Sequence, residues 1–243
     1  TGSAFGDVFT GNGAAILAGG RGNDVYYANG RDSVREAAGE GRDIVVSRGS
    51  FALGSDAEIE VLKLSGVSSR TPANLTGSNS ANEIFGHAGA NTLKGQGGND
   101  VLKASSGNDK IFGGTGNDTL FGGAGNDTLK GDSGRDIFVF DTSPNKRTNV
   151  DRIVDFNVKD DTFWLDNKAF VKLGSGSLSK PKKLKADMFV KGAQAQDRED
   201  RIIYDRKTGA LYYDPDGTGS KAQVKIATLS KNLKLTYHDF FVI

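Results

Sequence analysis

The sequence predicts an all-β protein: a parallel β-roll, which is a β-solenoid of nine-residue repeats, followed by a C-terminal β-rich capping module. Two observations predict this fold. The chain has 34 Gly but only 4 Pro, about twice the usual share of Gly without the Pro of collagen or disordered linkers. Residues 77–139 also divide into seven consecutive nonads in one register. We therefore expect the glycines to occupy an ordered, periodic backbone.

Each nonad carries an apolar residue at its eighth position and Asp or Asn at its sixth. The nonads read GSNSANEIF, GHAGANTLK, GQGGNDVLK, ASSGNDKIF, GGTGNDTLF, GGAGNDTLK and GDSGRDIFV. One apolar residue in nine fits neither an amphipathic helix nor a long alternating strand. A very short strand and a glycine-rich turn fit, with the apolar side chain pointing inward. Two nonads then form one coil, so each turn lies above the turn eighteen residues earlier.

The periodic acidic residues predict a metal ion between the turns. Burying one Leu contributes about 1.5 to 3 kcal/mol, whereas ordering each of nine backbone residues costs roughly 1 to 2 kcal/mol. Stacked carboxylates also repel each other at the spacing of neighbouring strands, about 4.8 Å. A cation between the turns relieves both problems. Carboxylate and carbonyl ligands, in a chain with no Cys, predict calcium. The alternative, a metal-free β-helix, leaves the periodic Asp unexplained.

The candidate ligands lie on the two edges of the predicted roll. The expected pairs are Asp100 with Asp118, Asp118 with Asp136, and, on the other edge, Asp109 with Asp127. Asn91 faces Asp109 and Asn82 faces Asp100, so we expect weaker or empty sites there because a charge is lost. The turn residues expected to contribute oxygens or close turns are Gly95, Gly97, Gly98, Gly107, Gly113, Gly114, Thr115, Gly116, Gly122, Gly123, Ala124, Gly125, Gly131, Ser133 and Gly134.

The nonads GGTGNDTLF and GGAGNDTLK contain the pattern GGxGxDxUx, where U is apolar. This pattern resembles the RTX family of hemolysin-type calcium-binding repeats. The resemblance implies a parallel β-roll that binds several calcium ions between successive glycine-rich loops.

An isolated copy of the pattern lies near the N-terminus, at Gly19–Tyr27, and GEGRDIV at Gly39–Val45 repeats its GxGxD part nineteen residues later. We expect a further calcium site there with Asp24 and Asp43, closed by Gly20 and Gly22. An extra ligand is expected from Asp32, Glu36 or Glu40. The alternative is a solvated acidic loop. The segment Gly49–Gly66 is expected to form strands that continue the solenoid.

The segment after the last nonad, DRIVDF at Asp151–Phe156, resembles the closing segment of serralysin-like C-terminal domains. That resemblance implies that Asp151 pairs with Asp136 and helps to bind the last calcium ion. It also implies that Asn145, where the family has Asp, lies over Asp127. For Asp155 we favour a role as a carboxylate that caps a turn.

The C-terminal residues are expected to cap the open end of the solenoid. Ile202–Asp214 reads as a hairpin around Gly209, and DPDGTG at Asp214–Gly219 as a plain turn rather than a calcium loop. Asp239–Ile243 resembles the C-terminal signal of type I secretion; the alternative is a final edge strand. The expected parts are residues 1–76 with irregular coils and one repeat, 77–156 with the calcium-binding roll, and 157–243 with the β module and export signal.

Several function classes lack support in the sequence. The 31 basic and 30 acidic residues nearly balance, which gives no sign of a nucleic-acid partner, and no apolar run is long enough to span a membrane. The basic run KPKKLK, Lys180–Lys185, is expected to be a solvated loop. Neither H-E-x-x-H nor G-x-S-x-G occurs. We expect no enzyme activity from this chain.

These observations predict a secreted, extracellular bacterial calcium-binding module that has no catalytic centre. Residues 1–9 lack a basic and apolar leader, so we expect export through the type I secretion machinery and a longer parent protein upstream. The alternative is a calcium-dependent module that recognises a polysaccharide or a cell surface, as RTX-like modules of alginate epimerases do. An enzyme would need a site that the sequence does not display.

Overall fold

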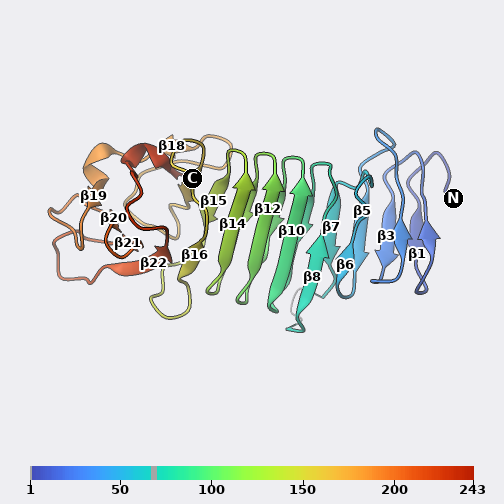
Figure 1. Cartoon of the computed structure of the whole chain (residues 1–243), viewed down its shortest axis with the longest axis horizontal. Helices are drawn as coiled ribbons and strands as arrows, with labels where there is room; N and C mark the ends of the chain where they lie inside the picture. Colours follow the sequence, from blue (N-terminus) through green and yellow to red (C-terminus); the bar gives the residue numbers. More distant parts are fainter. Residues whose placement is uncertain (1, 67–69) are drawn as a thin grey trace.

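The structure is a computed structural model that describes residues 2–66 and 70–243. Over these residues the chain forms β-strands and two short 3₁₀ turns, η1 (Ala186–Met188) and η2 (Tyr237–Asp239), but no α-helix. The chain winds as a flattened solenoid from its N-terminal end towards a β-rich C-terminal end (Figure 1). No helix within the described ranges is long and apolar enough to cross a membrane. The all-β prediction and the parallel β-roll are confirmed.

Two long sheets form the faces of the roll. Within the described residues the larger sheet has eleven strands, in the order β1 (Val8–Thr10), β3 (Val25–Ala28), β5 (Ile44–Ser47), β7 (Val61–Leu64), β9 (Glu83–Phe85), β11 (Val101–Lys103), β13 (Thr119–Phe121), β15 (Ile137–Phe140), β17 (Thr162–Leu165), β23 (Phe240–Val242) and β18 (Lys182–Lys183).

The second sheet has ten strands over the same part of the chain. Its order is β19 (Phe189–Lys191), β20 (Ile202–Asp205), β21 (Ala210–Tyr213), β22 (Val224–Thr228), β16 (Asp151–Ile153), β14 (Thr128–Ser133), β12 (Lys110–Thr115), β10 (Asn91–Gly97), β8 (Ala73–Thr76) and β6 (Phe51–Ala52). A small sheet pairs β2 (Ile16–Leu17) with β4 (Ser33–Val34).

The register of the roll follows the nine-residue period. Neighbouring strands are parallel, and Leu102 pairs with Leu120 while Leu93 pairs with Ile111, eighteen residues apart in each case. These eighth-position side chains are buried in the core between the two sheets. Each coil therefore adds one apolar side chain from each sheet to a continuous ladder. The predicted inward direction of position eight is confirmed.

The fourth-position glycines let the turns stack closely. Gly116, Gly125 and Gly134 have φ of +124°, +150° and +147°, a region that side-chain-bearing residues rarely adopt. A Cβ at Gly116 or Gly134 would also overlap the carbonyl oxygen of the turn one coil earlier. Gly at this position therefore satisfies two constraints at once, the conformation of the turn and its distance to the next turn.

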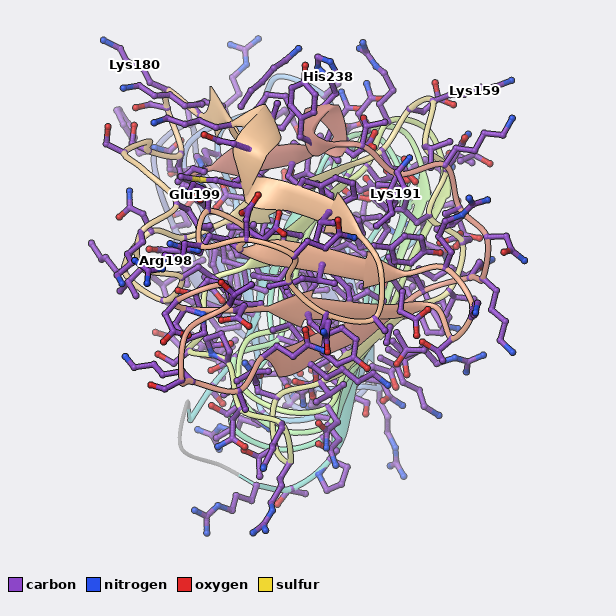
Figure 2. All side chains as sticks on the ribbon, turned by 90° about the vertical axis from the view of Figure 1, so that its left-hand side faces the viewer. Lys159, Lys180, Lys191, Arg198, Glu199 and His238 are labelled. Atoms are coloured by element: carbon purple, nitrogen blue, oxygen red, sulfur yellow. The ribbon has the colours of Figure 1, made fainter. Side chains whose placement is uncertain are left out.

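The C-terminal strands close the end of the roll by extending both sheets. Strand β22 pairs with β16, and β23 pairs with β17. Inside this end, the Phe163 ring stacks on Phe156 with centroids 4.2 Å apart and on Phe240 at 5.2 Å. Figure 2 shows the strands of the C-terminal region lying across the end of the roll, with Lys159 and Lys180 pointing outward at its rim. The apolar core is thus covered by a cluster of aromatic rings.

Four expectations for the C-terminal part can be compared with the structure. Strands β20 and β21 form the predicted antiparallel hairpin around Gly209, whose φ is +78°. Residues 214–219 lie in the connection between the antiparallel strands β21 and β22, where the Asp214 side chain accepts from the Asp216 N–H. The idea of a final edge strand is wrong, because β23 lies between β17 and β18. Lys182–Lys183, expected in a loop, form that outer strand with exposed side chains.

We predict that Phe163→Ala lowers the free energy of unfolding by about 3 to 5 kcal/mol, because the fully buried ring contacts four other Phe rings. Urea denaturation in excess calcium measures the change. The exposed Lys159→Ala serves as the control. A loss below about 1 kcal/mol for Phe163→Ala would show that the aromatic cluster is not the core of this end.

Candidate metal centre

The sixth-position Asp side chains link each coil to the coil before it. Each Asp directly precedes a strand, and its Oδ1 accepts the backbone N–H of the Asp eighteen residues earlier. The N···O distance is 2.8 Å from Asp100 to Asp118, 2.9 Å from Asp118 to Asp136, and 2.8 Å from Asp109 to Asp127. The three predicted pairs are therefore neighbours in the structure. The turns that hold the predicted glycines stack with them on the two edges of the roll.

The second carboxylate oxygen of four of these residues, Asp100, Asp109, Asp118 and Asp127, has no hydrogen-bond donor. Among the described residues, five Oδ2 atoms are buried without a partner: those of Asp24, Asp100, Asp109, Asp118 and Asp127. Buried polar atoms are nearly always hydrogen-bonded, since an unpaired one costs free energy. Five unpaired oxygens that recur with the repeat, all acceptors, therefore indicate a missing positive partner.

Each unpaired oxygen lies in a space that glycine keeps open. A Cβ built at Gly95 or Gly113, the first position of the nonad, would overlap the Oδ2 of the Asp five residues later. The same Cβ would meet the carbonyl oxygen of the first-position residue in the next coil, Gly113 or Gly131. Carboxylate and carbonyl oxygens from successive turns thus converge beside a glycine. This is an oxygen cradle of the kind that a hard cation occupies.

Burial without a counter-charge shifts the titration of these carboxyl groups. Burial raises the pKa of Asp100 and Asp136 to about 7, and the backbone N–H donated to each carboxylate offsets only part of that effect. For Asp118 and Asp127 burial raises the pKa to about 6. The nearby Asp127 carboxylate adds to the effect of burial on the pKa of Asp109, which reaches about 7. The charged form is therefore disfavoured until a cation compensates it.

The donor set fits calcium. Each pair of stacked turns brings together two carboxylates, and no group of three or more His, Cys, Asp and Glu side chains that could hold a metal occurs in the part of the chain that the structure describes. A bound cation would thus take most of its ligands from backbone carbonyls. Calcium accepts six to eight oxygen ligands in flexible geometry, including carbonyls. Metals that prefer sulfur or nitrogen ligands find no Cys or His side chain in the acidic turns of residues 95–136.

The N-terminal coils repeat the arrangement with spacings of 17 and 19 residues instead of 18. Asp43 Oδ1 accepts the Asp24 N–H at 2.8 Å, so the predicted Asp24–Asp43 pair is formed. Glu36 approaches the same place by accepting the Gly19 N–H at 2.6 Å and the Tyr26 hydroxyl.

The remaining two expected ligands have other partners. Asp32 binds the backbone of residues 13–15 with Oδ1, and Glu40 accepts from the Ala37 N–H. Asp32 thus links its coil to the turn 17 to 19 residues earlier, whereas Glu40 caps a local turn, and these bonds place neither residue as a partner of Asp24.

Three acidic residues of the ladder were missed by the sequence analysis. Asp24 Oδ1 accepts the Asp7 N–H at 2.6 Å, Glu60 accepts the Asp43 N–H at 2.6 Å, and Asp161 accepts the Asp136 N–H at 2.9 Å. None of the three lies in a GxGxD turn. Each nevertheless directly precedes a strand, as the sixth-position Asp does, and that signal could have identified them.

The pairing inferred from the serralysin-like resemblance is wrong. Asp151 accepts the Asp127 N–H at 3.0 Å, so it continues the Asp109–Asp127 edge, not the Asp136 edge. The connection through residues 140–150 gives that coil 24 residues, six more than the regular coils. Asn145 does not lie over Asp127; it forms a local bridge with Asn149.

The capping role favoured for Asp155 is confirmed. Its carboxylate accepts the backbone N–H groups of Gly131 and Asp132 at 3.0 and 2.9 Å. Both oxygens are therefore committed to the last turn of the array.

The stacked turns and their acidic edges define a parallel β-roll with periodic metal-binding loops. Residues 9–32, 76–111 and 103–138 match the family model described as the RTX calcium-binding nonapeptide repeat. These segments are RTX calcium-binding nonapeptide repeats, and that family binds calcium ions. Residues 139–243 lie outside the match, so the serralysin-like character of the C-terminal part stays a prediction. No curated protein matches the chain.

We predict that Asp118→Asn and Asp127→Asn each reduce the number of calcium ions bound, because each residue contacts a turn on both sides. Losing one ion present at 100 times its dissociation constant removes about 2.7 kcal/mol of stabilisation. Isothermal titration and chemical denaturation measure the two effects. Asp56→Asn, an exposed site away from the ladder, should leave both unchanged. Equal stoichiometry in all four proteins would contradict the assignment.

Proposed function

We propose that the chain is a non-catalytic, secreted calcium-binding module whose roll folds when calcium binds between its acidic turns. One observation carries the proposal: the recurring, buried Asp Oδ2 atoms that lack a donor. The ligands we propose are the sixth-position carboxylates together with carbonyl oxygens of the glycine-rich turns. Asp24 with Asp43 and Asp127 with Asp151 extend the same arrangement beyond the seven nonads.

Calcium would supply the charge compensation that this chain lacks between its carboxylates. The protein groups do the rest: the backbone N–H holds Oδ1, glycine leaves space for Oδ2, and the eighth-position side chains hold the coils together. Neighbouring sites share an Asp, so filling one site orders the turn that serves the next. Binding free energy therefore becomes folding free energy, and the transition is expected to be cooperative.

This coupling suits a protein that leaves the cell before it folds. Calcium modules that work outside cells have dissociation constants of about 0.1 to 1 mM. At the far lower calcium concentration inside a cell, the carboxylates would remain uncompensated and the roll unfolded. The resemblance of Asp239–Ile243 to a type I secretion signal supports export by that route. The β-roll is typically a structural calcium-binding fold, which supports a role without catalysis.

We predict that the protein loses most of its β-structure in excess EGTA and regains it when calcium, but not magnesium, is added. Magnesium requires near-ideal octahedral geometry and sheds its water reluctantly, so it cannot replace calcium in carbonyl-rich turns. Far-ultraviolet circular dichroism monitors the change. An unchanged spectrum in EGTA would show that the roll does not depend on metal.

A second function, recognition of a polysaccharide, is favoured by one surface. On the outward face of the eleven-stranded sheet, Phe85, Lys103 and Phe121 lie side by side on β9, β11 and β13. The Lys103 Nζ lies 5.6 Å from the centroid of the Phe85 ring and 5.0 Å from that of Phe121. Lys63 precedes this row on β7. Phe121 is buried in a small apolar cluster with Val139 and Ile243, whereas Phe85 and Lys103 are half-buried. The Phe85 ring and the Lys103 ammonium group would therefore be the groups that suit an acidic sugar chain on this face.

We predict that the calcium-loaded protein binds acidic oligosaccharides on a glycan array and that Lys103→Ala weakens this binding at least threefold. Lys110→Ala, an exposed Lys on the opposite sheet, is the control. If the protein binds no glycan on the array, the recognition function is wrong and only the structural calcium-binding function is left.

A further inference from the structure

Two coils of the ladder carry Asn where the others carry Asp, and the structure shows what these amides do. Asn82 Nδ2 donates to the Ile59 carbonyl at 2.5 Å, and its Oδ1 accepts the Ser78 N–H at 2.8 Å. On the other edge, Asn91 Nδ2 donates to the Ala73 carbonyl at 3.3 Å. Both residues are only 2 % exposed.

The Asn91 side chain is also bonded at its other end, because Oδ1 accepts the His87 N–H at 2.8 Å. Neither amide contributes an unpaired buried atom within the described ranges, whereas Asp100 and Asp109, one coil later, each leave Oδ2 without a donor. Asn and Asp therefore occupy equivalent positions in the repeat but differ in whether their buried side-chain atoms are hydrogen-bonded. The amides satisfy every buried side-chain atom, and the carboxylates do not.

The reason lies in the donors. A carboxylate has only acceptor atoms, whereas an amide carries an NH₂ group with two donors. Beside the carbonyl oxygens of Ile59 and Ala73, a carboxylate would add repulsion between oxygens, but the amide forms a hydrogen bond. The amide nitrogen thus links two oxygen-bearing turns, which is the task that a cation performs in the acidic coils.

The backbone around these amides needs no metal for its other contacts. Asn82 and Asn91 still donate their own N–H groups to Asp100 and Asp109 at 2.7 Å, so the register of the ladder is unbroken. The inward side chains Leu75, Ile84 and Leu93 of these coils are fully buried.

We propose that Asn82 and Asn91 are metal-free cross-links and that the coils around them form a calcium-independent seam. The seam lies between two acidic blocks, one running from Asp7 to Glu60 and the other from Asp100 to Asp161. Asn82 and Asn91 determine which turns of the roll do not take calcium. This inference rests on the proposed function, because it assumes that calcium binds between the acidic turns.

The test converts the seam into acidic coils. In the double variant Asn82→Asp/Asn91→Asp, we expect isothermal titration to show one additional calcium ion for each converted residue. The calcium concentration at the midpoint of folding should rise at least threefold, because two new like-charged pairs with Asp100 and Asp109 must be compensated first. The free energy of unfolding should also depend more steeply on the logarithm of the calcium concentration than in the unmodified protein.

The control variant adds two negative charges, as the seam variant does, but at exposed positions of neighbouring turns. Asn99 and Asn117 are exposed fifth-position residues whose Oδ1 atoms accept backbone N–H groups, a bond that Asp can also form. Asn99→Asp/Asn117→Asp should therefore bind the same number of ions as the unmodified protein. If Asn82→Asp/Asn91→Asp also gains no ion, and the calcium dependence of its folding is unchanged, the proposal of a calcium-independent seam is wrong. If the double variant does not fold, the single variants Asn82→Asp and Asn91→Asp are tested in the same way.

The seam and the proposed function would be contradicted by different results. If the unmodified protein shows calcium-dependent folding but the seam variant gains no ion, only the role of the amides is wrong. If the unmodified protein binds no calcium at all, the proposed function is wrong and the seam falls with it. A calcium or lanthanide ion found between residues 77–82 and 95–100 of the unmodified protein would also overturn the seam.

Discussion

The fold depends on one hydrogen bond that recurs along each edge: a side-chain oxygen reaches back to the backbone N–H of the preceding coil. Asp118 Oδ1 and the Asp100 N–H, 2.8 Å apart, are one example. The bond fixes the eighteen-residue register and buries the carboxylate at the start of a strand. It also directs the second oxygen into the space beside a first-position glycine. Calcium binding is therefore a consequence of how the coils are held in register.

The period predicted the roll, its register and the central acidic pairs because these features follow from local repetition. Position eight could only point inward, as Leu120 does, and glycine at position four follows from the stacking of turns such as that at Gly116. Where the repeat is interrupted, the prediction failed. The connection through residues 140–150 makes one coil six residues longer than the regular coil of eighteen, so the residue that faces Asp127 is Asp151 rather than Asn145.

Other parts of the structure could not be predicted because they depend on contacts distant in sequence. Asp161 completes the ladder after Asp136, although no glycine-rich turn precedes it. The aromatic cluster joins Phe138, Phe163 and Phe240, which no periodic pattern connects. The sequence also showed that Asn82 lacks a charge, but not that its amide would find the carbonyl of Ile59, because that carbonyl belongs to an irregular coil.

The internal position of β23 has a consequence for the proposed export signal. Phe240, Val242 and Ile243 are buried, and β23 is flanked by β17 on one side and β18 on the other. A receptor that read these residues in the native protein would have to pull a strand out of the sheet. If Asp239–Ile243 serve as the proposed export signal, that signal would be accessible only in an unfolded chain. Calcium-driven folding before export would then bury the signal within the sheet.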